Sequence, residues 1–154
     1  MLTKEELRVG NYIIGKTVDG FRDINERILD PPTPGGIATS PFSVRSTGRG
    51  YELVQEIDTR ITLPYAWANG ILIDENWLEG LGFKRSNSDY QTYSKGDMTV
   101  RLVAGECLVY YQQMPIDQPI KFIHELQNTY ADLARNLLTL PEGKTKPSLK
   151  EGFE

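Results

Sequence analysis

The stretch from residue 89 to residue 138 constrains the fold most, because its hydrophobic pattern changes from a period of two to a helical period. Residues 89–94, 98–103 and 106–112 alternate apolar and polar side chains, which is typical of half-buried strands. The dipeptides Lys95-Gly96 and Ala104-Gly105 favour two-residue hairpin turns between them. We therefore predict a three-stranded antiparallel meander here.

Two helices are predicted on either side of this meander. Asp74 is a suitable N-cap for a helix that continues to Leu81, and Gly82 is a suitable stop. Residues 120–138 carry an apolar stripe at helical spacing. The stripe consists of Ile123, Leu126, Tyr130, Leu133 and Leu137. We predict a C-terminal helix over this range.

The N-terminal half is predicted to be mainly β. Residues 7–14 are rich in strand formers, and Gly10-Asn11 indicates a bulge or close packing within them. Residues 21–29 fit either a short helix or a strand. Residues 51–57, with an extension to residue 63, favour another strand.

Residues 30–50 contain four of the nine prolines and four of the fourteen glycines. Proline disfavours pairing inside a sheet, and glycine permits unusual backbone angles, so the composition predicts one long loop. Loops of this length in compact domains are usually functional or disordered. Together these patterns predict a single α+β domain over residues 1–139 and a flexible tail over residues 140–154.

Composition restricts the classes of function. The chain has 154 residues, which suits one domain, and a formal net charge of -4, which disfavours binding to duplex nucleic acid. Its one cysteine and one histidine exclude an intramolecular disulfide and a cysteine-based zinc site. The charged start and the lack of a long apolar run predict no signal peptide, no membrane span and a cytoplasmic location.

Three stretches of the chain form recognisable short motifs: LRVGNY at residues 7–12, IDENWLEGLGF at residues 73–83 and IHELQNTY at residues 123–130. They resemble the motifs of a family of small, uncharacterised proteins of bacteriophages and of mobile elements in gut bacteria. The family patterns are LRxGN, LTEEWLxxxGF and VHxLQNLY. The resemblance implies an accessory protein that acts against or alongside host processes, in the host cytoplasm, with no established activity. The Pro/Gly-rich stretch departs from the family pattern, so a function of that stretch would be specific to this chain.

No motif of common enzyme chemistry is present. Cys107 alternates with apolar strand residues, which favours core packing, and His124 borders the apolar stripe, where a hydrogen bond to a loop is the simplest role. Asp74, Glu75 and Glu79 surround a helix start, where acids stabilise the helix without catalysing anything. We expect a protein that is not an enzyme and that needs neither a cofactor nor a metal.

The first candidate binding site lies in residues 43–50. Its candidate residues are Arg45, Ser46, Thr47, Gly48 and Arg49. Glycines let backbone N–H groups converge, hydroxyl groups donate hydrogen bonds, and arginines offer forked donors, so this stretch could hold a phosphate or a nucleotide. The same composition is typical of a solvated hairpin tip, and the spacing does not decide between the two.

The second candidate site is the outer face of the meander, with Tyr90, Arg101 and Tyr110 as its binding residues. Aromatic and arginine side chains on an exposed sheet can stack a base or contact a protein. The alternative is that a helix or the N-terminal strands cover this face. A slip of one residue in either turn would exchange the two faces.

The leading hypothesis is a non-catalytic protein that sequesters a small phosphorylated or nucleotide-derived signalling molecule as a counter-defence. A homo-oligomer could enclose such a ligand between its copies, with Arg45 and Arg49 reaching across the boundary. The alternative hypothesis is an inhibitor or adaptor that binds a host protein.

Overall fold

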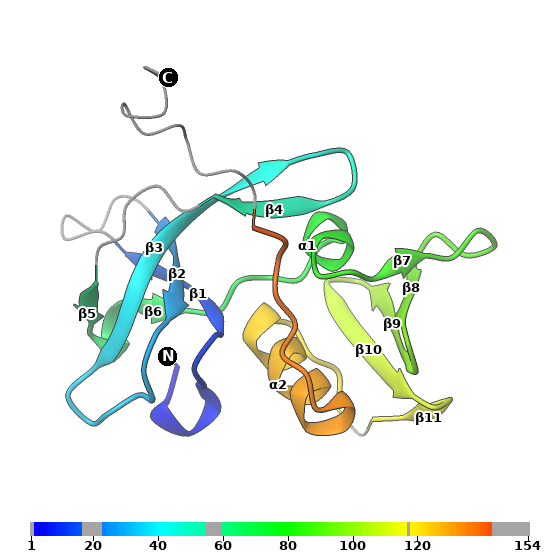
Figure 1. The fold of residues 1–154 in the computed structure, drawn as a ribbon. Coiled ribbons are helices and arrows are strands. Elements are labelled where there is room, and N and C mark those ends of the chain that lie inside the picture. The colour runs from blue at the N-terminus through cyan, green and yellow to red at the C-terminus, as the bar shows by residue number, and fades with distance from the viewer. Residues whose placement is uncertain (1, 17–22, 55–59, 117, 143–154) are drawn as a thin grey trace, which may run out of the picture.

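The computed structural model describes residues 2–16, 23–54, 60–116 and 118–142. In these ranges, two antiparallel sheets lie on either side of two α-helices (Figure 1). The predicted α+β class is confirmed.

The first sheet is built from the N-terminal half of the chain and has six strands among the residues that the structure describes. They are β1 (Tyr12–Lys16), β2 (Asp23–Ile28), β3 (Ile37–Ser46), β4 (Tyr51–Val54), β5 (Ile61–Leu63) and β6 (Ala68–Asn69). Their order is β4-β3-β2-β1-β6, and β5 pairs with the first part of β3. Two 3-10 helices, η1 (Lys4–Glu6) and η2 (Tyr65–Trp67), complete this half.

Strand β1 is buried on both faces of the first sheet. Successive side chains of a strand point to opposite faces, and those of Tyr12 and Ile13 are both buried. Tyr12 of β1 lies in the main core, with its ring 5.7 Å from that of Trp77. The next residue, Ile13, packs in a smaller core with Ile28 and Ile37. Consecutive apolar residues in β1 are therefore both buried, on different sides.

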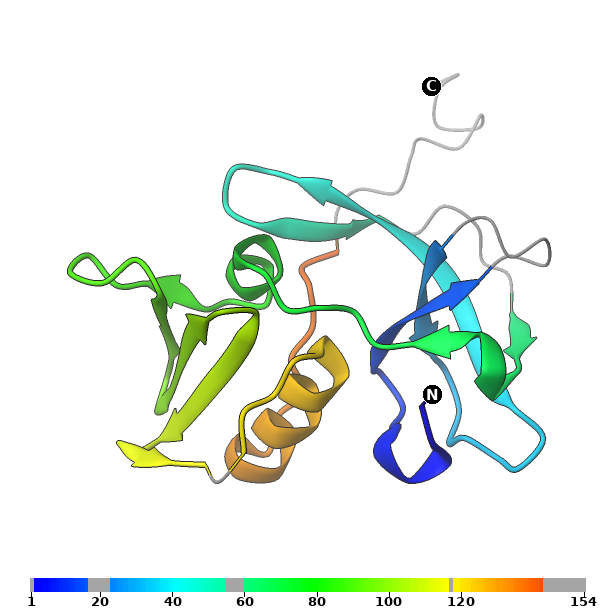
Figure 2. The ribbon, with the colours of Figure 1, turned by 180° about the vertical axis from the view of Figure 1, so that it is seen from behind.

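The second sheet has five strands in the order β11-β10-β9-β8-β7. The elements of this half are α1 (Glu75–Gly80), β7 (Lys84–Arg85), β8 (Thr92–Lys95), β9 (Met98–Val103), β10 (Glu106–Tyr111), β11 (Met114–Pro115) and α2 (Ile123–Ala134). Helix α2 lies against the inner face of this sheet, between it and the first sheet, in both views (Figures 1 and 2). Its buried residues Ile123, Leu126 and Tyr130 belong to the main core.

The two hairpin turns of this sheet differ in how well they were predicted. Ala104-Gly105 joins β9 to β10 as predicted, with φ of 51° and 81°, the backbone of a type I′ turn. The turn between β8 and β9 is Gly96-Asp97, one residue later than the predicted Lys95-Gly96. This shift moves every cross-strand partner by two residues, so the predicted inner and outer faces are unchanged.

Residues 30–50 do not form one long loop, and that prediction is wrong for Ile37–Ser46, which form β3. Pro41 lies inside this strand, opposite Glu26 of β2. On the other side, β3 pairs with β5 up to Thr39 and with β4 from Ser43. Pro41 falls where the partner strand changes, and a residue without an N–H interrupts the ladder least there.

The strand predicted over residues 7–14 is correct only at its end. The chain turns before β1, because Gly10 has a φ of 89° and the Asn11 N–H donates to the Arg8 carbonyl at 3.1 Å. The ambiguous segment 21–29 forms strand β2, and its first two residues lie outside the described ranges. The predicted strand over residues 51–57 is seen as β4, and residues 55–59 also lie outside the described ranges.

Helix α2 is shorter at both ends than the predicted range 120–138. It ends at Ala134, and Arg135 follows with a left-handed φ of 61°. Leu137 is therefore not part of a helical stripe and is 42% exposed. The chain then returns to the core: Leu140, which the sequence analysis placed in the tail, is buried, and Pro141 accepts a hydrogen bond from the Leu53 N–H at 2.8 Å. Residues 143–154 of the predicted tail lie outside the described ranges.

Candidate functional site

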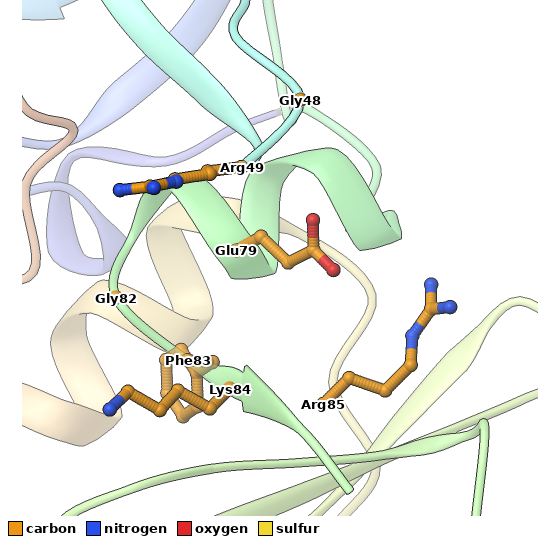
Figure 3. A pocket seen from close by; sticks show the side chains of 7 residues that line it. All are labelled: Gly48, Arg49, Glu79, Gly82, Phe83, Lys84 and Arg85. Atoms are coloured by element: carbon orange, nitrogen blue, oxygen red, sulfur yellow. The ribbon is translucent and has the colours of Figure 1, made fainter. Parts of the chain in front are cut away.

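A hollow lies between the tip of the β3–β4 hairpin and the segment that joins α1 to β7 (Figure 3). Its volume is about 410 Å³, within the range of small-molecule sites. The lining residues are Gly48, Arg49, Glu79, Gly82, Phe83, Lys84 and Arg85. Three of these seven residues are cationic and one is anionic, so the hollow favours an anion.

The hairpin tip is a compact turn that presents Gly48 and Arg49. The Thr47 N–H and hydroxyl both donate to the Gly50 carbonyl, each at 3.1 Å. Gly48 has a φ of 82°, which glycine adopts without strain. The turn is therefore closed by its own residues, and the Arg49 side chain is not needed to hold it.

A close contact between two glycines fixes this tip on α1. A Cβ atom at Gly50 would lie only 2.2 Å from the Gly80 nitrogen, and a Cβ at Gly80 would lie 2.4 Å from the Tyr51 carbonyl oxygen. Any other residue would force the hairpin away from the helix. The two walls of the hollow can therefore pack this closely because Gly50 and Gly80 have no side chains.

The other wall follows from how α1 begins and ends. The Asp74 carboxylate accepts a hydrogen bond from the Trp77 N–H at 2.9 Å, which confirms the predicted N-cap. Gly82 has a φ of 100°, and the Lys95 ammonium donates to the Leu81 carbonyl at 2.9 Å. The helix ends there, and the chain continues into β7, where Lys84 lines the hollow.

The charged groups of the hollow are not equivalent. The side chains of Arg49 and Lys84 are exposed, and neither makes a hydrogen bond or ion pair with any described residue. Arg85 is different: its guanidinium donates to the Tyr93 hydroxyl at 3.0 Å and pairs with Glu75. Its hydrogen bond to Tyr93, with smaller contributions from Glu75 and Glu79, raises the pKa of Arg85. The unpaired positive charge therefore belongs to Arg49 and Lys84.

The structure divides the first predicted site. Gly48 and Arg49 line the hollow, whereas Arg45 lies in β3 and forms an ion pair with Glu52 of β4. Ser46 ends β3 and Thr47 closes the turn, and neither is among the lining residues. Arg45 is thus a cross-strand partner within the sheet, separate from the two unpaired cations.

The second predicted site is also divided. Arg101 and Tyr110 share the outer face of the second sheet, where Arg101 lies 3.8 Å from the Asp89 carboxylate. Tyr90 instead lines a separate hollow with Leu102, whose side chain alternates to the opposite face from that of Arg101. No described element covers the outer face in Figures 1 and 2.

The segment after Gly82 contributes to the hollow, although the sequence patterns did not predict it. Lys84 and Arg85 are two adjacent cations directly after a helix stop, and that pattern is the only local signal. Glu79 was considered only as an acid near a helix start, yet it lines the hollow. What could not be foreseen is the contact of Gly50 with Gly80, which brings the hairpin to the helix.

The two residues considered for covalent catalysis are buried. Burial raises the pKa of the Cys107 thiol to about 12, so the thiol is not ionised near neutral pH, and its predicted core position is confirmed. His124 does not bond to a loop as predicted: neither ring nitrogen has a hydrogen-bond partner among the described residues. Burial lowers its pKa, and the nearest carboxylate oxygen, of Glu6, lies 3.9 Å away, which is too long for a hydrogen bond.

The first and last of the three stretches used for the family resemblance meet at one polar junction. The Gln127 side chain accepts from the Tyr12 N–H at 2.8 Å and donates to the carbonyls of Gly10 and Leu138 at 3.0 and 2.9 Å. The Asn11 amide donates to Asn128 at 2.9 Å. These polar residues hold the first sheet on α2. Their presence in the two motifs is therefore explained by a structural role.

Among the described residues there is no group of three or more acidic, histidine or cysteine side chains suited to a metal ion. No helix in the same ranges combines the length and the apolar surface that crossing a membrane requires. Comparison of the chain with protein-family models, with curated proteins and with solved structures finds no match.

Proposed function

We propose that this chain is a non-catalytic binding protein that holds a small phosphorylated ligand in the hollow beneath the β3–β4 hairpin. The observation that carries this proposal is the pair of unpaired cations, Arg49 and Lys84, beside a hollow of about 410 Å³. Cationic side chains without an internal partner are free to make charge-assisted hydrogen bonds to phosphate oxygens.

The surroundings of these cations support a binding role. Gly48 and Gly82 line the hollow without side chains, so a ligand can approach the backbone there. Neither of the two nucleophile or base candidates, Cys107 and His124, is among the lining residues. A ligand held here would be retained by charge and shape and released unchanged.

The biological role that we propose is sequestration of a nucleotide-derived signalling molecule, as a counter-defence by a phage or mobile-element accessory protein. The support for the ligand is the cationic hollow, and the support for the context is the resemblance of residues 7–12, 73–83 and 123–130. A second copy of the chain, packed over the exposed Arg49 side, would enclose the ligand further.

Two measurements test this function. Mass spectrometry of molecules released on denaturing the purified protein should reveal a phosphorylated compound. Titration calorimetry with adenosine monophosphate should show binding that the Arg49→Ala, Lys84→Ala double variant weakens about a hundredfold, because each charge-assisted contact contributes about 1.5–3 kcal/mol. The Lys4→Ala, Lys121→Ala double variant removes the same charge outside the hollow and should bind normally. Equal affinities in the two double variants would refute the site.

The uncovered outer face of the second sheet supports a second function, contact with a host protein through Arg101 and Tyr110. Tyrosine and arginine side chains are enriched where protein interfaces gain their affinity, and on this face Arg101 is exposed and Tyr110 is half-buried. On this alternative, the protein should retain a host macromolecule in affinity purification, and Arg101→Ala with Tyr110→Ala should release it. Arg49→Ala with Lys84→Ala should then have no effect on the retained partner.

A further inference from the structure

The hollow has two electrostatically different ends. Figure 3 shows the Arg49 and Lys84 side chains extending to one side, with the Glu79 carboxylate and the Arg85 guanidinium on the other. Arg85 is already engaged by Glu75 and by the Tyr93 hydroxyl. The first end therefore carries two unpaired positive charges, and the second end carries the additional negative charge of Glu79.

The Glu79 carboxylate is attracted to the Arg85 guanidinium but does not contact it directly. It is half-buried at the end of α1 and accepts no hydrogen bond and forms no ion pair within 4.0 Å among the described residues. A phosphate group would be attracted to the first end and repelled from the second. The second end instead suits a part of the ligand that donates hydrogen bonds.

Building on the proposed function, we propose that Glu79 makes the hollow selective for a phosphate monoester that also carries a vicinal diol. The phosphate would bind Arg49 and Lys84, and the two hydroxyl groups would donate to the two oxygens of the Glu79 carboxylate. In dinucleotide sites, a carboxylate side chain accepts a hydrogen bond from the ribose 2′-hydroxyl. A second phosphate group, or a sugar without one hydroxyl, would bind more weakly.

Glu79→Gln tests this assignment, because it keeps the size of the side chain and removes its charge. Titration calorimetry would compare adenosine monophosphate, deoxyadenosine monophosphate, ribose phosphate and pyrophosphate. The wild-type chain should bind adenosine monophosphate about tenfold or more tightly than the deoxy compound, since a hydrogen bond to a charged group is lost. In Glu79→Gln this preference should largely disappear, and pyrophosphate should bind more tightly than to the wild type.

Glu5→Gln is the matched control, because Glu5 lies on η1 and is not among the residues that line the hollow, so its change should leave every affinity unaltered. Ribose phosphate separates the two sources of the diol: binding as tight as that of the nucleotide assigns the site to sugar phosphates, and weaker binding assigns it to ribonucleotides.

A wild-type protein that binds both nucleotides equally, or a Glu79→Gln variant that keeps the preference, overturns the role of Glu79. Loss of all binding in Arg49→Ala, Lys84→Ala would meanwhile leave the proposed function intact. Failure of every phosphorylated compound to bind the wild type would overturn both.

Discussion

Two polar regions of this molecule differ in whether their polar side chains have hydrogen-bond partners inside the fold. At the junction of the first sheet with α2, the buried side chain of Gln127 has three hydrogen-bond partners on the backbone, at 2.8 to 3.0 Å. At the hollow beneath the β3–β4 hairpin, Arg49 and Lys84 are exposed and have no internal partner.

The difference separates stability from binding. Polar groups that are buried must be paired inside the fold, because an unsatisfied buried group costs about 1–3 kcal/mol. Polar groups that are exposed and unpaired contribute little to stability and remain available to a ligand. The junction should therefore tolerate no substitution, and the hollow should tolerate most of them in stability while losing its ligand.

The largest effect is expected at the junction. Gln127→Ala should lower the free energy of unfolding by about 3–6 kcal/mol, because it leaves the Tyr12 N–H and the carbonyls of Gly10 and Leu138 buried without their partner. Gln91→Ala, at an exposed glutamine, is the control and should change stability by less than about 0.5 kcal/mol. Urea unfolding of the two variants would show this contrast, and similar midpoints would contradict it.

A smaller effect is expected at Gly80, where the β3–β4 hairpin contacts α1. An alanine Cβ there would lie 2.4 Å from the Tyr51 carbonyl oxygen, so Gly80→Ala should displace the hairpin and destabilise by about 1–3 kcal/mol. Its anion affinity should fall as well, because both walls of the hollow move. Gly35→Ala, whose Cβ would meet nothing closer than 3.7 Å, should leave stability and affinity unchanged.

The protonation of His124 should contribute to the pH dependence of stability. Burial lowers its folded pKa below the ordinary value of 6.5, while Glu6 and Glu125 act in the opposite direction. The unfolded chain therefore binds the proton more readily, so stability is lost as pH falls below about 6.5, by at most about 1.4 kcal/mol per pH unit. His124→Phe, which keeps a ring next to Phe122, should flatten this part of the profile. An identical slope in both proteins would remove His124 from the explanation.

The smallest stability effect is expected at the hollow. Arg49→Ala with Lys84→Ala should shift the free energy of unfolding by less than about 0.5 kcal/mol, because neither side chain has a partner to lose. Thermal unfolding without ligand provides the measurement. A clear destabilisation would mean that these cations support the fold, against the distinction drawn between the two regions.

Sequence patterns predicted the elements that depend on neighbouring residues. The Asp74 cap, the Ala104-Gly105 turn and strand β9 are local, and each was found at its predicted position. Strand β3 was missed because Pro41 is tolerated only where two partner strands succeed each other. That arrangement depends on distant residues, which no local pattern reports.

Only part of the candidate site was predicted, because its other part also depends on contacts between distant residues. Arg49 and Gly48 could be identified from the glycine-rich turn, because a turn is local. Their partners Lys84 and Glu79 come from a segment about 30 residues further along, and only the approach of Gly50 to Gly80 brings the two together. Arg45 was included because spacing cannot show that Glu52 lies opposite it in the sheet.

Backbone amide NMR during titration with adenosine monophosphate tests the separation of the two regions most directly. The amide signals of Gly48, Gly82 and Lys84 should shift with a single saturable affinity. Those of Gly10 and Asn11, at the junction, should stay in place. Shifts confined to the junction or to the outer face around Arg101, or no shift at any amide, would contradict the account.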